Sequence, residues 1–330
     1  MFQTTTVGNH PKISEANDRE NLRRAYNRFD AGKIDADELE AAVRDTIRGA
    51  VLDQVNAGID RVTDGRIRWD DPVTPFAAAH EGFEIGGLIR FFNNNVYYRR
   101  PIISKPIRFK KSAVVDDFKL AKSFSDQPMM ASVCGPFSMA KFCVNEAYKD
   151  ERALYRDCAA LVAQEIEVLA AVGAEWVQLD EPFVGFCPDE IDTAVATISD
   201  AVRDTRINTF VYVYFSPIQR VVNRLWDLPV TMIGADCVSV PGNLDALCGG
   251  PSEIARAFGI MDARNTRLES NDQIHRQMAR IVDAGAEEWP ACWLTPSAAL
   301  EFLPHGRAVD KLKRLTDAVT TFSRAAVNHS

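Results

Sequence analysis

Hydrophobic and polar residues are arranged along the chain in blocks that predict strands and helices in alternation. Short apolar runs predict strands at 2–7, 61–65, 128–134, 175–180, 207–215, 230–236, 257–261 and 289–295. Apolar residues that recur every three or four positions predict helices at 17–58 (with a break at Ala31-Gly32), 151–172, 188–204, 217–226, from about 243, 269–284 and 307–324. Eight strands that are mostly separated by helices predict an α/β fold, the (β/α)8 or TIM barrel.

The predicted domain organisation is a single barrel over residues 1–330. Residues 17–58 form a helical extension between the first two strands, and residues 89–108 form a hairpin. A doubly wound open sheet is the competing architecture, but it usually carries a Gly-rich phosphate loop after an early strand. Neither 7–11 nor 84–87 has that glycine spacing. We therefore expect one cooperative barrel with no separable half.

Composition and charge narrow the functional classes. No apolar run approaches the ~18 residues that cross a membrane. The net charge is −8 and the basic residues are dispersed, which argues against nucleic-acid binding. The seven cysteines include no Cys-x-x-Cys pair, and the first residues lack the pattern of a cleavable signal. We expect a cytoplasmic protein with reduced cysteines that acts on a small molecule, with no membrane or nucleic-acid partner.

The candidate functional residues are those at the carboxyl ends of the predicted strands, where barrel enzymes carry their chemistry. The clearest case is 175–182, an apolar strand that ends in two acids and a proline. The polar residues at these ends are Asn9, His10, Asp64, Arg66, Asp180, Glu181, Tyr212, Tyr214, Asp236, Asp262 and Arg264. Such a set can hold a small polar substrate between paired charges. The alternative is structural: aspartate–arginine ion pairs, a turn histidine and tyrosines of the core.

No motif for a metal, a nucleophilic serine or a phosphate loop is present. The five histidines are far apart, without His-x-His or His-x-x-x-His spacing. Gly-x-Ser-x-Gly and Gly-x-x-x-x-Gly-Lys are both absent. The residues alone therefore predict no metal site and no nucleotide cofactor.

Several short motifs together resemble the C-terminal catalytic barrel of cobalamin-independent methionine synthase. They are Thr5-Thr6-Val7-Gly8-Asn9, Val62-Thr63-Asp64-Gly65, Gly135-Pro136-Phe137-Ser138, Gln178-Leu179-Asp180-Glu181-Pro182, Gly259-Ile260-Met261-Asp262 and Leu294-Thr295-Pro296. Each is short, but they share the family's order and spacing from Thr5 to about residue 318. The resemblance implies a barrel of the methionine synthase and uroporphyrinogen decarboxylase type.

The resemblance also implies a catalytic zinc ion, which activates a substrate thiol for methyl transfer from a folate. The family's ligands are a His-x-Cys pair, a Glu and a Cys. These positions align with Tyr212 and Tyr214, with Asp236, and with Ala298. One carboxylate is too few for a zinc site, so we expect that the usual zinc is lost. Cys237 and Cys292 lie nearby in the sequence and are the candidate replacement ligands.

The substrate positions differ from the family pattern as well. The family holds the amino group of homocysteine with two carboxylates; one aligns with Asp180, but the other aligns with Arg66. Because arginine repels an ammonium and pairs with anions, we expect a small anionic substrate. Asn9 replaces a serine near the substrate carboxylate, and the family's catalytic histidine aligns with Arg264. Phe142 falls near a tryptophan associated with the folate ring, so a folate-type methyl donor is compatible with the chain.

The sequence thus predicts a methionine synthase-like transferase that moves a methyl or alkyl group without the usual zinc. In this hypothesis Asp180, Glu181, Tyr212, Tyr214 and Asp236 are the catalytic group. Three alternatives remain open: a metal-free lyase or decarboxylase, a non-catalytic ligand-binding or partner subunit, and a zinc-dependent methyl-folate:homocysteine methyltransferase with an unusual site.

Overall fold

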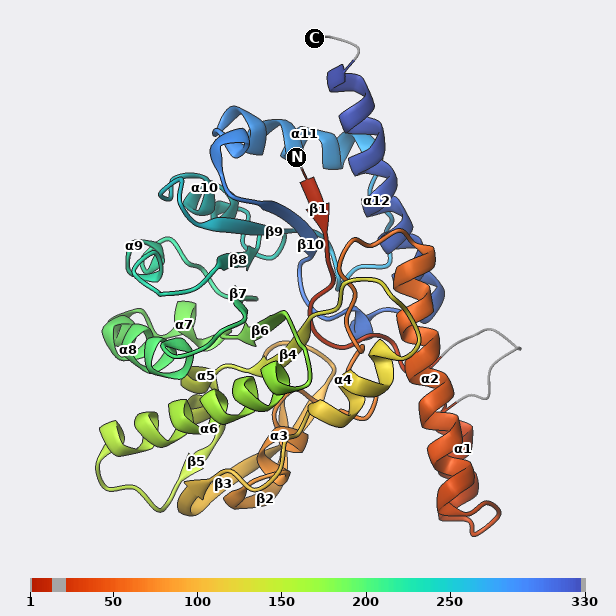
Figure 1. Ribbon diagram of the computed structural model, residues 1–330, viewed down its shortest axis with the longest axis vertical. Helices are drawn as coiled ribbons and strands as arrows, with labels where there is room; N and C mark the ends of the chain where they lie inside the picture. The colour runs from red at the N-terminus through yellow and green to blue at the C-terminus, as the bar shows by residue number, and fades with distance from the viewer. Residues whose placement is uncertain (1, 14–21, 328–330) are drawn as a thin grey trace.

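The computed structural model describes residues 2–13 and 22–327, and its centre is a curled parallel β-sheet (Figure 1). Neighbouring strands follow the order β1-β10-β9-β8-β7-β6-β4. Their bounds are β1 Phe2–Thr4, β4 Ala131–Cys134, β6 Trp176–Asp180, β7 Asn208–Val213, β8 Met232–Asp236, β9 Ala255–Met261 and β10 Cys292–Pro296. Nearly all of their residues are buried, as expected when helices cover the outside of a barrel and side chains fill the inside.

The segment at Arg61 and Val62 links the two edge strands of this sheet. Thr5 forms a parallel bridge with Arg61, and Val62 forms one with Met129. The predicted (β/α)8 fold class is therefore confirmed. This second strand is shorter than the predicted 61–65, because the backbone N–H of Thr63 donates to the side chain of Gln54 at 2.8 Å rather than to a neighbouring strand.

Helices surround the sheet and mostly follow its strands in sequence (Figure 1). They are α1 Leu22–Asp30, α2 Ala36–Asn56, α3 Thr74–Ala78, α4 Val115–Lys122, α5 Pro136–Phe142, α6 Glu151–Ala171, α7 Phe183–Phe186, α8 Ile191–Val202, α9 Val222–Leu225, α10 Gly242–Cys248, α11 Asn271–Asp283 and α12 His305–Val327. Capping boxes start α2, with Asp35 and Glu38, and α11, with Ser270 and Gln273. Part of the predicted helix 17–58 lies outside the described residues.

The predicted helix 217–226 is reduced to the single turn α9. Residues 216–218, just before α9, are held outside a helix by the side chain of Asn243, which lies at the start of α10. This side chain accepts from the backbone N–H of Ile218 at 3.0 Å and donates to the carbonyl of Ser216 at 3.0 Å. These contacts satisfy backbone groups just before α9 that have no partner in a strand or helix.

A long hairpin projects from the barrel wall and consists of β2 Glu81–Arg90 and β3 Tyr97–Arg108 (Figure 1). The two-residue strand β5 Val144–Asn145 pairs with β3. The predicted hairpin, 89–108, began too late because its first strand contains three glycines, which disfavour a strand by composition. Glycine is required at Gly86, where a Cβ would lie 2.6 Å from the carbonyl oxygen of Arg100.

No helix among the described residues is long and apolar enough to cross a membrane. The seven cysteines are all free thiols in the structure.

Candidate active site

A small buried cavity lies where the carboxyl ends of several barrel strands converge. Its lining consists of Val7, Gly8, Asn9, Arg66, Pro72, Phe91, Asp180, Tyr214, Phe215, Ala298, Ala299, Glu301 and Phe302. Its volume is about 20 Å³, which is room for about one water molecule. The structure therefore brings together four of the residues selected from the sequence: Asn9, Arg66, Asp180 and Tyr214.

Arg66 and Asp180 form a buried ion pair in this cavity. The Nη2 of Arg66 lies 2.6 Å from Oδ2 of Asp180, and both side chains are about 2–3% exposed. The same Nη2 contacts Ser132, while the Nε2 of Gln178 donates to the other oxygen of Asp180 at 2.6 Å. The Nε of Arg66 is buried and has no hydrogen-bond partner among the described residues. Arg66, which lines the cavity, thus keeps one buried guanidinium donor without an acceptor among the described residues.

Glu301 is a cavity residue that was not predicted from the sequence. It lies in the short 3-10 turn Leu300–Phe302 after β10, where its Oε2 accepts from the side-chain amide of Asn9 at 3.1 Å. Burial raises the pKa of Glu301 to about 7. This carboxyl group can therefore gain or lose a proton near neutral pH, as a general acid or base requires.

A layer of aromatic side chains lies at the cavity, which Phe91, Tyr214, Phe215 and Phe302 line. Its members are Phe91, Phe92, Phe142, Phe183, Phe186, Tyr214, Phe215 and Phe302, each in ring contact with at least one other member. Phe142, predicted to contact a folate, stacks on Phe91 with ring centroids 5.6 Å apart. Phe92 and Phe215 both have positive φ, 50° and 65°, which is costly for a residue with a bulky side chain. The backbone is thus strained at Phe215, which lines the cavity, and at Phe92, whose ring contacts that of Phe215.

The residues aligned with the family's zinc ligands make other interactions. The hydroxyl of Tyr212 is 3.0 Å from the carbonyl oxygens of Pro296 and of Ser297, to which it donates. Burial raises the pKa of Tyr212 and of Tyr214 well above the usual value. Asp236 accepts from the backbone N–H groups of residues 215, 238 and 239 at 2.8–3.3 Å. Two neutral phenols and a carboxylate that caps a turn stand at these positions.

The side chain of Glu181 binds the N-terminus of the neighbouring helix α5 and does not line the cavity. Its carboxylate accepts from the backbone N–H groups of Phe137 and Ser138, at 3.0 and 2.8 Å, in the first turn of α5. Burial raises the pKa of Glu181 to about 7. Gly135 permits this approach, since a Cβ there would lie 2.3 Å from Oε1 of Glu181.

His10 and Asp64 are buried but do not line the cavity. The Nε2 of His10 lies 3.3 Å from Oδ2 of Asp53 in α2. Asp64 accepts from the backbone N–H of Arg66 at 3.2 Å, and burial raises its pKa to about 6. Asp64 thus supports the turn that carries Arg66.

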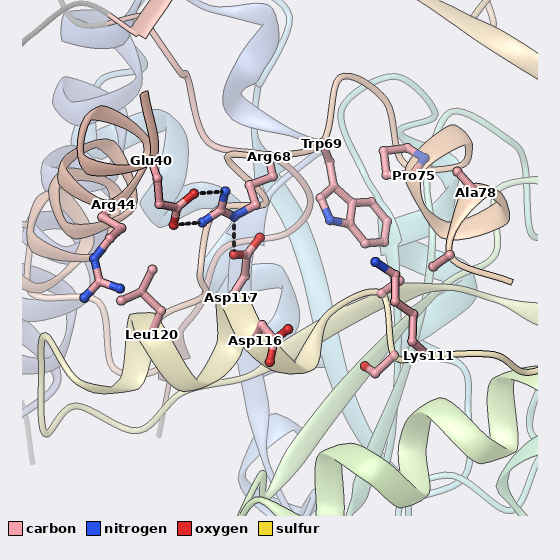
Figure 2. Close-up of a pocket in the computed structure, with 13 residues that line it drawn as sticks. Glu40, Arg44, Arg68, Trp69, Pro75, Ala78, Lys111, Asp116, Asp117 and Leu120 are labelled. Carbon is pink, nitrogen blue, oxygen red and sulfur yellow. Dashed lines mark hydrogen bonds and ion pairs between the residues drawn. The ribbon is translucent and has the colours of Figure 1, made fainter. Parts of the chain in front are cut away.

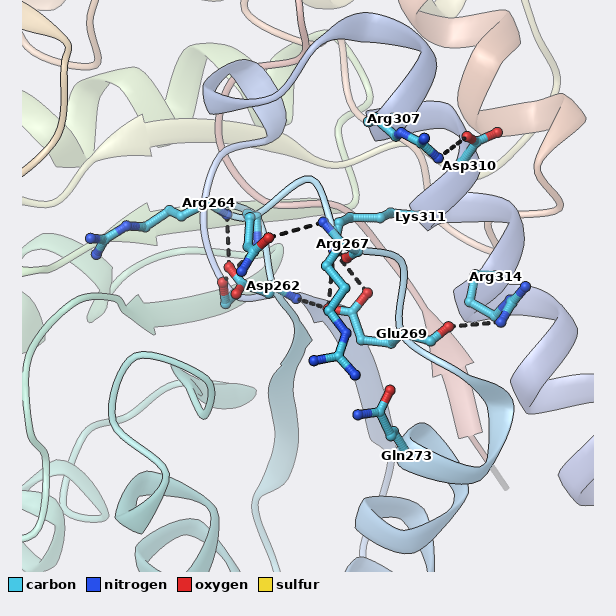
Figure 3. A network of polar contacts seen from close by, with 12 residues as sticks. Asp262, Arg264, Arg267, Glu269, Gln273, Arg307, Asp310, Lys311 and Arg314 are labelled. Carbon is cyan, nitrogen blue, oxygen red and sulfur yellow. Dashed lines mark hydrogen bonds and ion pairs between the residues drawn. The ribbon is translucent and has the colours of Figure 1, made fainter.

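Asp262 and Arg264 belong to a polar network outside the cavity (Figure 3). Asp262 accepts from the backbone N–H of Arg264 at 2.8 Å and donates its own N–H to Glu269 at 2.9 Å. Lys311 of α12 pairs with Glu269 at 2.8 Å. The exposed guanidinium of Arg264 lies 5.2 Å from the ring centroid of Phe215, so Arg264 covers the outer side of the aromatic layer.

A wider pocket, of about 600 Å³, opens between α2, α4 and the loop after the second strand (Figure 2). Its central guanidinium, that of Arg68, pairs with Glu40 at 2.5 Å and with Asp117 at 2.7 Å. Because these charges satisfy one another, we take the buried cavity at the strand ends as the candidate active site.

Comparison with known proteins agrees with this architecture. The family model described as "Cobalamin-independent synthase, Catalytic domain" matches residues 2–321. A protein named methionine synthase from Sulfolobus acidocaldarius is 26% identical over 319 residues, covering 94% of this chain and 89% of that protein. One of the same name from Sulfurisphaera tokodaii is 28% identical over 322 residues, covering 94% and 90%.

Solved structures show the same fold. A B12-independent methionine synthase from Shewanella sp. W3-18-1, determined with selenomethionine, superposes with a TM-score of 0.81 at 20% identity and covers 98% of both chains. A protein from Listeria monocytogenes, described as a putative vitamin-B12 independent methionine synthase, has a TM-score of 0.73 at 15% identity, covering 97% of this chain and 98% of that one. With a family model that spans nearly its whole length, this chain belongs to the cobalamin-independent synthase family, as a homologue of its catalytic domain.

Proposed function

We propose that this protein is a transferase that moves a methyl or other alkyl group onto or from a small anionic substrate, without the family's catalytic zinc. The observation that carries the proposal is the Nε of Arg66, a buried donor in the cavity that has no partner among the described residues. Leaving such a donor unpaired is costly. The acceptor that satisfies a guanidinium best is an oxygen of a carboxylate, sulfonate or phosphate.

The chemistry of the donor set argues against zinc at the family's position. Tyr212 and Tyr214 would have to ionise to bind the metal, and burial opposes this by raising both pKa values. Ala298 offers no ligand atom. Both oxygens of Asp236 already accept backbone N–H groups. Cys237 is buried, and burial raises the pKa of its thiol, so it is a poor substitute.

The cavity residues support distinct roles in such a reaction. Arg66 would bind the anion, while Asp180 fixes the guanidinium at 2.6 Å. Glu301, with a pKa of about 7, would exchange the proton that the substrate or the donor loses or gains. The buried hydroxyl of Tyr214 would donate a hydrogen bond to developing negative charge.

The aromatic layer has to move before a substrate binds. A volume of about 20 Å³ does not hold a small organic anion. Phe215 lines the cavity and contacts Phe92, and both are strained, so we expect the layer to open at these two positions. Aromatic faces are also suitable contacts for a flat folate-type methyl donor.

Binding of small anions by wild-type protein and by Arg66→Gln tests this proposal. Titration calorimetry with carboxylates, sulfonates and phosphates is expected to identify a ligand that binds the wild type. Arg66→Gln should weaken that ligand by ~10–100-fold, which corresponds to one or two charge-assisted hydrogen bonds. Arg220→Gln is the matched control, because Arg220 is an exposed arginine paired only with Asp189 among the described residues. Equal affinity in wild type and Arg66→Gln would remove Arg66 from the site.

Turnover of the identified ligand then distinguishes the reaction classes. Mass-balanced transfer of a methyl or alkyl group from a donor is the expected result. Loss of carbon dioxide or cleavage of the ligand without a donor would identify a lyase, the alternative that also needs no metal. Binding without any turnover would identify a ligand-binding subunit.

The affinity for the anion is expected to fall as pH rises through about 7. Protonated Glu301 is neutral, whereas its carboxylate repels an anion in the same cavity by roughly 2–3 kcal/mol at a separation of ~6 Å and an effective dielectric constant of ~20. The fall between pH 6 and pH 8 should therefore approach but not exceed about tenfold, because Glu301 passes from mostly protonated to mostly ionised in this interval. A sulfonate is the probe of choice, because it does not titrate in this range. In Glu301→Gln the affinity should be nearly independent of pH; an unchanged pH dependence would assign the titration to another group.

A further inference from the structure

A cluster of three metal-ligating side chains lies beside the cavity, at positions unrelated to the family's zinc ligands. It consists of His10 after β1, Asp53 in the last turn of α2, and His305 at the start of α12. The Nε2 atoms of His10 and His305 lie 3.3 and 2.7 Å from the same oxygen, Oδ2 of Asp53. We refer to these three residues as the His-Asp-His cluster.

We propose that the His-Asp-His cluster binds one divalent transition-metal ion, with Zn²⁺ as the best-matched species. The three ligand atoms all lie within 4.8 Å of one another. Ligands at ~2.0–2.2 Å from a tetrahedral zinc ion are separated by roughly 3.3–3.5 Å, so a small adjustment opens the space for the ion. Two imidazoles and one carboxylate are a recurrent protein ligand set for zinc and for non-haem iron.

Burial of the cluster favours a metal ion over hydrated side chains. The side chains are 3%, 10% and 12% exposed for His10, Asp53 and His305. A buried carboxylate is stable only when paired or when it coordinates a metal. A divalent ion would replace the contacts of the two imidazoles with Asp53 by bonds from both imidazoles and the carboxylate to the metal.

The position of the cluster suggests what the ion would do. Figure 1 shows α2 beside α12, and the hydroxyl of Thr316 in α12 also donates to the carbonyl of Ala57 at 2.6 Å. The ion would fasten both helices to the loop after β1. That loop carries Asn9, whose side chain contacts Glu301. The metal would therefore be a structural one that positions the cavity wall without contacting the substrate.

Zinc uptake by the full chain, purified without metal-affinity steps and treated with chelator, tests the proposal. The wild type is expected to take up about one Zn²⁺ per chain and to gain thermal stability on doing so. His10→Ala and His305→Ala should each lower the zinc affinity by more than ~100-fold, exceeding the usual effect of losing an outer-shell partner. Co²⁺ should give a visible absorption spectrum in the wild type that is lost in both variants.

Two control variants show whether the zinc is bound at this cluster or elsewhere on the chain. His275→Ala should keep the zinc, because His275 hydrogen-bonds to Ala318 and Thr321 away from the cluster. Arg66→Gln should also keep it, so the result is independent of the proposed anion site. Asp53→Asn, which keeps the side-chain shape, replaces any histidine variant that circular dichroism shows to be unfolded. Two outcomes would show that the cluster is only hydrogen-bonded. One is no zinc uptake by the wild type, and the other is zinc uptake by His305→Ala and Asp53→Asn that equals that of the wild type.

Discussion

Arg66→Leu is expected to lower the free energy of unfolding by ~3–5 kcal/mol at neutral pH, the range measured when one partner of a buried ion pair is removed. Both side chains of the Arg66–Asp180 pair are about 2–3% exposed, so water cannot replace the lost guanidinium. Gln178 would still donate to Asp180, but one neutral amide does not neutralise a buried carboxylate. Chemical denaturation of the wild type and the variant measures this difference.

A double-mutant cycle isolates the pair from the rest of the cavity. Asp180→Leu alone should also be destabilising, because it leaves a buried guanidinium without its charge partner. The double variant Arg66→Leu with Asp180→Leu should be less destabilised than the sum of the single variants by at least ~1–3 kcal/mol. Additive losses, or single losses below ~1 kcal/mol, would contradict a coupled buried pair.

The same variants distinguish a structural pair from a functional one. If the pair exists only to hold β6 to the turn at residue 66, then the double variant should keep any anion affinity. We expect the opposite, because the Nε of Arg66 has no partner among the described residues and an anionic ligand would supply an acceptor for it. Stability and binding should therefore separate in the double variant: stability is partly recovered and binding is lost.

The barrel was predictable because its strands are buried on both faces. Such strands appear as short apolar runs, and the runs at 175–180, 230–236 and 257–261 correspond to β6, β8 and β9 within a few residues. The predicted bounds were wrong where side chains, rather than neighbouring backbone groups, form hydrogen bonds with the backbone. Gln54 accepts from the backbone N–H of Thr63 where the second strand ends early, and Asn243 bonds the backbone of Ser216 and Ile218 where the predicted helix 217–226 begins late. Such contacts join residues whose pairing leaves no periodic signal.

The site was predictable only in part, for a related reason. Arg66, Asp180, Asn9 and Tyr214 lie at or just after strand ends, which converge in any barrel. Glu301 lies five residues beyond β10 in a turn without a motif, so only its place after the last strand pointed toward the cavity. Glu181 follows a strand end too, yet its carboxylate turns to the N-terminus of α5.

The His-Asp-His cluster shows the limit of spacing rules. His305 and Asp53 are 252 residues apart, and His10 and Asp53 are 43 apart. Metal motifs in sequences are found when two ligands share one helix or one turn. Here each ligand comes from a different part of the chain, and the packing of α12 against both α2 and β1 brings them together.

Methylation of homocysteine by methyl-folate is expected to be undetectable with this protein, with or without added Zn²⁺. The family's reaction depends on a metal-bound thiolate, whereas a free thiol with a pKa near 8.5 is only a few per cent ionised at neutral pH. Tyr212 keeps its proton to donate to the carbonyls of Pro296 and Ser297, and Ala298 has no ligand atom. Arg66 stands where the family holds the substrate ammonium and would repel it.

Methionine formation and metal content, measured on the same preparations, test this expectation. Zinc found in the wild type should persist in Asp236→Asn and disappear in His305→Ala, because the ion would then belong to the His-Asp-His cluster. Asp236→Asn is the conservative choice, since Asp236 accepts three backbone N–H groups and its removal would disturb the turn. Methionine formed by the wild type, together with zinc that is lost in Asp236→Asn or Cys237→Ser but kept in His305→Ala, would instead establish a zinc-dependent methyltransferase with an unusual site.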